Sequence, residues 1–110
     1  MEIGWMRIIE LDANRWTTPL DFLSALKSAL GCPPWHGDSP DAFVDSMVWG
    51  GINSVEPPYT IQVIGTSSIP REVIEYVSLM ASVIREAREE RYRNRGDDID
   101  VSISATESSD

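Results

Sequence analysis

The chain has 110 residues, of which 42% are apolar, and its formal net charge is -9 at pH 7. This length and composition fit one compact domain with a modest apolar core. The negative charge argues against nucleic acid or an anionic membrane as the direct partner, because both present phosphates that would repel this surface. A basic protein is the partner that the charge favours.

The sequence also bears on where the protein works. Its longest apolar runs fall far short of the roughly 20 residues needed to cross a bilayer, and residues 1–4 lack the pattern of a signal peptide. The single cysteine, Cys32, rules out an internal disulfide framework. We therefore expect a cytoplasmic protein without a cofactor, monomeric when it is unbound.

The first elements are a strand and a helix. Residues 7–11 form a short apolar run that ends at a turn, which predicts a strand. Residues 18–21 (TPLD) combine a hydroxyl, a proline and an acid, as at the start of a helix. The helix should span about 18–30 and end at Gly31. We expect its apolar side to contain Leu20, Phe22, Leu23, Ala25, Leu26 and Leu30.

A second, shorter helix follows a loop. Residues 39–41 (SPD) repeat the helix-start pattern, so this helix should begin near residue 40 and end at Trp49 or Gly50. Phe43 and Met47 predict its inner edge, with Val44 or Val48 at the margin.

Two strands and a long helix complete the chain. Residues 59–64 are rich in β-branched side chains and predict a buried strand. The apolar stripe Val73, Val77, Met80, Ile84 and Ala87 predicts a helix between Pro70 and Gly96. Residues 99–104 alternate strictly, which predicts a last strand with one buried face.

The element order is therefore β-α-α-β-α-β. Strands separated by helices pair in parallel, so we predict an α/β fold with a three-stranded parallel β-sheet packed with helices. A single domain should cover residues 1–105, followed by a frayed tail at 106–110.

Acidic residues gather in the middle of the chain. No lysine or arginine occurs between Lys27 and Arg71, whereas this segment holds Asp38, Asp41, Asp45 and Glu56. The helix dipole explains Asp41, which lies in a first turn. Asp45 lies beyond that turn and one turn from a like charge, at a cost of about 0.2–0.5 kcal/mol. This penalty suggests that Asp45 is used in binding.

Residues 85–95 instead mix both signs of charge. Five arginines and three glutamates alternate there, which is typical of a solvated helix surface with pairs such as Glu89 and Arg93 at a spacing of four residues.

Residues 30–47, LGCPPWHGDSPDAFVDSM, resemble the signature of the barstar family, and residues 83–87, VIREA, are similar to its last helix. The resemblance extends over nearly the whole chain through the order of elements. It implies a barstar-like fold and an intracellular inhibitor, or immunity protein, that plugs the active site of a ribonuclease with this loop and helix.

The resemblance also implies which residues bind the partner. Asp45 matches the aspartate that takes the place of a substrate phosphate, and Asp41 matches the acid one turn earlier. Trp35 matches an aromatic that packs on the enzyme, and Gly37 a glycine in close contact with it. The expected partner-binding set is Trp35, His36, Gly37, Asp38, Asp41, Val44, Asp45, Trp49 and, at the periphery, Glu86.

The sequence departs from the family pattern at four positions of the same segment. His36 stands for a tyrosine, Ser39 for an asparagine, Pro40 for a leucine and Val44 for a tryptophan. These departures favour a target other than barnase itself.

The residues themselves leave alternatives open. Paired carboxylates can perform acid-base catalysis, and His36 with Asp38, Asp41 and Asp45 could bind a divalent cation. The sequence has no second histidine and no phosphate-binding glycine loop, so we expect neither an enzyme nor a metal site. An acidic adaptor, or a nucleic-acid mimic that blocks another basic protein, is the remaining alternative.

Overall fold

The computed structural model describes residues 7–105. The predictions made for residues 1–4 and for the tail at 106–110 lie outside this range. The elements are β1 (Arg7–Asp12), α1 (Pro19–Leu30), α2 (Pro40–Phe43), η1 (Val44–Trp49), β2 (Tyr59–Ile64), the short helix η2 (Thr66–Ser68), α3 (Arg71–Arg95) and β3 (Val101–Ala105).

The three strands form one parallel sheet in the order β1-β2-β3, as predicted. Tyr59 at the start of β2 aligns with Arg7 of β1 and Val101 of β3. Alternate residues of β2 are buried, beginning with Tyr59, because successive side chains point to opposite faces of a sheet. The predicted order β-α-α-β-α-β and the α/β class are confirmed.

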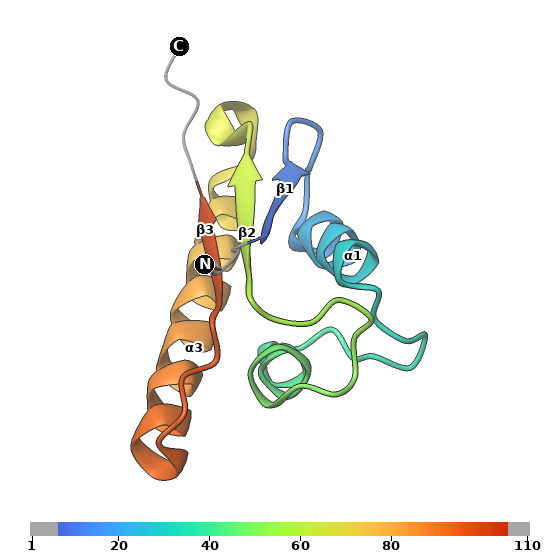
Figure 1. The fold of residues 1–110 in the computed structure, drawn as a ribbon. Helices are drawn as coiled ribbons and strands as arrows, with labels where there is room; N and C mark the ends of the chain where they lie inside the picture. Colours follow the sequence, from blue (N-terminus) through green and yellow to red (C-terminus); the bar gives the residue numbers. More distant parts are fainter. Residues whose placement is uncertain (1–6, 106–110) are drawn as a thin grey trace, which may run out of the picture.

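The helices are placed by their apolar faces. α3 lies along β3 and α1 lies beside β1 (Figure 1). The predicted stripe of α3 is buried at Val73, Val77, Met80 and Ile84. At the start of α1, the Asp21 carboxylate accepts the backbone N–H groups of Thr17 and Thr18, and these bonds lower the pKa of Asp21.

Two details of the predicted elements differ from the structure, the burial of one residue and the start of one strand. Leu20 was expected on the inner side of α1, but it is 60% exposed. It lies about 60° or more around the helix from the buried residues Phe22, Leu23, Leu26 and Leu30. The last strand begins at Val101 and not at residue 99, and Ile99 packs against the core from outside the strand.

The segment between α1 and β2 carries the acidic residues. It lies at the end of the sheet where β2 begins, and the C-terminal half of α3 extends past the sheet to the same level (Figure 1). α3 therefore contacts both α2 and η1 as well as β3.

Candidate functional site

Residues 40–49, called the acidic helix below, form one helical run with two geometries. Ser39 caps the first turn by accepting the N–H of Ala42 at 3.2 Å, and Pro40 occupies the first helical position. The first four residues are α-helical, and Val44–Trp49 is a π-helix. The predicted span is confirmed, but the change of geometry was not foreseen.

The π-helix includes Asp45. The backbone carbonyl of Asp45 accepts the N–H of Gly50 at 3.1 Å, five residues on. Gly50 then stops the helix with a φ of 79°, a conformation that favours glycine. π-helical turns are rare and are frequent at functional sites, so this geometry independently draws attention to Asp45.

Asp41 and Asp45 both lie exposed on this run. Four residues make close to a full turn in either helix type, so the two carboxylates come from successive turns. Neither forms an ion pair with any residue between 7 and 105. Phe43, Met47 and Val48 on the other side of the run are buried. The core therefore holds the run, while its acids face solvent.

The loop before this run presents an aromatic side chain. Trp35 is 72% exposed, and the N–H of His36 closes a turn on the carbonyl of Pro33 at 3.0 Å. Tryptophan is usually largely buried, so a side chain this exposed is a candidate contact residue. Gly37 lies exposed beside it.

His36 points inward instead, with 6% exposure. Its Nδ1 lies 2.7 Å from the carbonyl of Gly37 and its Nε2 lies 2.8 Å from the hydroxyl of Ser46. A carbonyl only accepts, so Nδ1 donates to Gly37, and Nε2 pairs with the Ser46 hydroxyl, which can donate or accept. The ring also packs on Phe43, with the ring centres 4.5 Å apart. His36 thus ties the Trp35 loop to the acidic helix.

Asp38 is placed differently from the other acids. Its carboxylate lies 2.6 Å from the Lys27 ammonium in the last turn of α1. The pair offsets the charge of Asp38, so less of that charge is available to a partner than at Asp41 or Asp45.

The end of the acidic helix contacts α3. Trp49 is 43% exposed, and its ring lies 5.3 Å and 5.7 Å from the guanidinium carbons of Arg91 and Arg95. Such distances allow cation–π attraction. Val44 is half-buried and packs against the core.

Glu86 lies on a different side of α3 from Arg91. It is exposed on α3 two residues after the buried Ile84, which places it about 200° around the helix from the core-facing side. Arg91, which contacts the end of η1, lies about 140° from Glu86 around the same axis.

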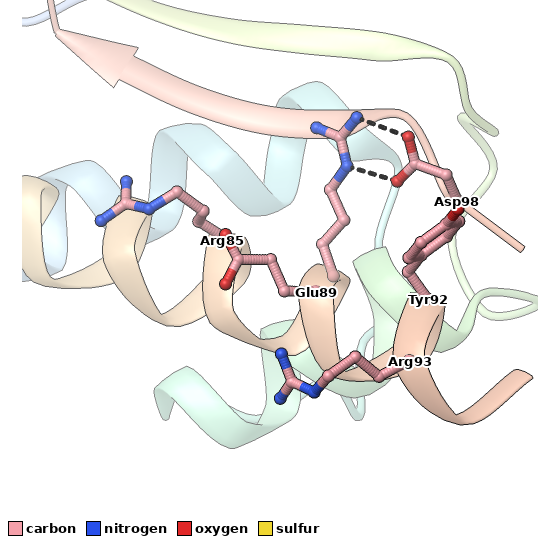
Figure 2. A pocket seen from close by; sticks show the side chains of 6 residues that line it. Arg85, Glu89, Tyr92, Arg93 and Asp98 are labelled. Atoms are coloured by element: carbon pink, nitrogen blue, oxygen red, sulfur yellow. Dashed lines mark hydrogen bonds and ion pairs between the residues drawn. The ribbon is translucent and has the colours of Figure 1, made fainter. Parts of the chain in front are cut away.

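A hollow of about 650 Å³ lies on the C-terminal half of α3. Figure 2 shows side chains of its lining, including Asp98 with two dashed bonds. These bonds come from Arg88 and measure 2.9 and 3.1 Å. These bonds lower the pKa of Asp98. The expected pair of Glu89 and Arg93 is not among the ion pairs formed within residues 7–105. None of the residues predicted to bind the partner lines this hollow.

The structure does not assemble the suggested metal site. Within the described range, no three histidine, cysteine, aspartate or glutamate side chains gather where they could hold an ion, and His36 is turned towards Ser46. A membrane-spanning helix is likewise not found among the helices of residues 7–105.

Sequence reasoning missed two supporting residues. Ser46 bonds His36, and Arg91 donates to the carbonyl of Val48. The spacing of ten residues between His36 and Ser46 gives no local signal, and Arg91 lies 43 residues from its acceptor.

One comparison with known proteins finds a match over nearly the whole chain. A search of curated proteins returned no similar sequence. The family model described as Barstar (barnase inhibitor) matches residues 6–104, nearly the whole chain, including the Trp35 loop, the acidic helix and α3. The chain therefore belongs to the barstar family.

Proposed function

We propose that this protein inhibits a ribonuclease inside the cell that makes it, as an immunity protein does, by blocking the enzyme's active site. The observation that carries the proposal is the pair of exposed carboxylates, Asp41 and Asp45, on a helical run whose other side is anchored in the core. Membership of a family described as barnase inhibitors supports a binding protein and not an enzyme.

The physical basis is mimicry of RNA. A ribonuclease gathers cationic side chains to hold a polyanion and to stabilise charge that develops on a phosphoryl group. Carboxylates can occupy the same positions, and their charge-assisted hydrogen bonds to arginine are among the stronger polar contacts. Because the helix already fixes Asp41 and Asp45, less ordering entropy is lost on binding than with a flexible acidic tail.

The other residues have different proposed roles. Trp35 supplies an exposed aromatic contact, and Gly37 lets the partner approach the backbone. His36 acts from inside the loop through Ser46. Asp38, Val44, Trp49 and Glu86 are proposed at the margin. Asp38 is paired with Lys27, Val44 is half-buried, and Trp49 lies against two arginines. Glu86 lies on a different side of α3 from Arg91.

The proposal is tested at Asp45. We expect Asp45→Ala to weaken the complex by more than about 2 kcal/mol, in the general range of interface hot spots, while thermal stability stays nearly unchanged. Titration calorimetry against barnase, and then against other basic ribonucleases, measures the dissociation constant.

Glu75→Ala is the matched control, because Glu75 is an exposed acid on α3 and its removal changes the net charge equally. Its dissociation constant should stay near that of the parent chain. An unchanged constant for Asp45→Ala would refute the assignment.

Departures at His36 and Val44 favour a target other than barnase. If the acidic face, which carries Asp41 and Asp45, instead binds a different basic protein, the chain is an adaptor or a nucleic-acid mimic. The two functions differ in what the chain protects: co-expression should relieve the growth arrest caused by the cognate ribonuclease only if inhibition is its function.

A further inference from the structure

Arg91 connects the end of α3 to the end of the acidic helix. One of its terminal nitrogens donates to the carbonyl of Val48, within η1. The guanidinium also lies over the Trp49 ring at 5.3 Å. The Arg91 side chain is only 16% exposed, so these contacts hold it between the two helices.

Asp97 fixes the guanidinium from behind. Its two carboxylate oxygens accept from Nε and Nη2 of Arg91 at 3.1 and 3.0 Å. Gly96, in the left-handed region with a φ of 78°, ends α3 and turns the chain so that Asp97 can reach back. A bidentate pair of this kind constrains both the position and the plane of the guanidinium.

These contacts act on the turn that bears Asp45. The π-helix closes through the bond from Gly50 to the Asp45 carbonyl, and Val48 and Trp49 lie inside that closed turn. We propose that Arg91, oriented by Asp97, is a positioning residue for ribonuclease inhibition, which holds this turn in the geometry that presents the Asp45 carboxylate. This inference rests on the proposed function and adds what keeps the turn bearing Asp45 rigid.

The same helix contains a matched control. Arg88 binds Asp98 through two nitrogens and donates its third to the carbonyl of Val101 at 3.1 Å. The pattern of hydrogen bonds therefore matches that of Arg91, although Arg88 also lies 3.3 Å from the Asp100 carboxylate and contacts β3 instead of η1. Arg91→Lys and Arg88→Lys each keep the charge and remove the planar fork.

The test compares these two variants in the full chain. Hydrogen exchange of the Gly50 amide reports the closing bond of the π-helix and needs no ribonuclease. We expect this amide to exchange at least about tenfold faster in Arg91→Lys than in the parent, and at the parent rate in Arg88→Lys. The dissociation constant for the ribonuclease should rise about tenfold in Arg91→Lys alone.

Each result decides between separate claims. Equal exchange of the Gly50 amide in the two variants would overturn the proposal that Arg91 holds the turn bearing Asp45. Faster exchange in Arg91→Lys with unchanged affinity would overturn its positioning role. Failure of the proposed function appears in the parent chain itself, as absence of binding to any ribonuclease, and is thereby distinguished from failure of the inference about Arg91.

Discussion

At the scale of single residues, Gly37 separates the needs of the fold from those of the partner. A Cβ added at Gly37 would lie 3.4 Å from the Ala42 Cβ, a tight contact that a small shift relieves. We expect Gly37→Ala to change the free energy of unfolding by no more than about 0.5 kcal/mol. The added methyl group would still lie between the loop backbone and a close partner, so the dissociation constant should rise. Urea unfolding and calorimetry measure the two quantities.

Gly50→Ala provides the contrast. The φ of 79° and ψ of -179° at Gly50 form a combination that only glycine adopts readily, so alanine should cost of order 1–3 kcal/mol in the free protein. If Gly37→Ala loses comparable stability, or binds as tightly as the parent, the role assigned to Gly37 is wrong.

Local sequence cues drew attention to three side chains of the candidate site that the structure leaves exposed. Asp41 and Asp45 follow a helix-start pattern within a segment free of lysine and arginine, and Trp35 follows two prolines. The supporting contacts were not predictable in this way. Arg91 occurs among five arginines of similar context, and only the packing of α3 against η1 selects it as the donor to Val48.

At the scale of elements, helix boundaries followed from capping residues. Gly31 and Gly96 both end their helices in the left-handed conformation, as their positions indicated. The π-helix could not be predicted, because an apolar spacing of four residues fits an α-helix and a π-helix alike. Contacts made by Val48 and Gly50 with other parts of the chain accompany the wider turn.

The end of α3 should make stability depend on acid pH. Hydrogen bonds from Arg91 and Arg88 lower the pKa of Asp97 and Asp98 in the folded protein. A carboxyl group with a lowered folded pKa contributes stability above its unfolded pKa, about 3.9 for aspartate, and loses it as pH falls through the folded pKa. Asp97→Asn with Asp98→Asn should therefore be less stable than the parent at pH 7 and equally stable near pH 2.

Urea midpoints at both pH values measure this difference. Asparagine keeps the size of the side chain, so packing changes little and the missing charge is what is tested. A difference of the same size at pH 7 and near pH 2 would show that the pairs contribute nothing through ionisation.

At the scale of the whole molecule, the parallel sheet followed from the alternation of strands and helices, and the β1-β2-β3 order has α1 beside β1 and α3 along β3 (Figure 1). The basic residues are concentrated near the end of α3. Five of the nine basic residues lie within residues 85–95, and none lies between Lys27 and Arg71. Basic and acidic residues are therefore unevenly distributed along the chain.

This asymmetry predicts how association with a ribonuclease depends on salt. An acidic face attracts a cationic cleft over long distances and favours encounters in the productive orientation. Salt screens this attraction, since the Debye length falls to about 3 Å at 1 M. We expect the association rate constant to fall about tenfold or more between roughly 50 mM and 1 M salt, with little change in dissociation. Stopped-flow fluorescence measures both constants.

Glu75→Ala should reduce the association rate constant slightly through net charge alone, whereas Asp45→Ala should chiefly speed dissociation, because its carboxylate acts at short range. An association rate that is independent of salt would contradict electrostatic attraction by the acidic face, and the aromatic contact of Trp35 would then have to account for recognition.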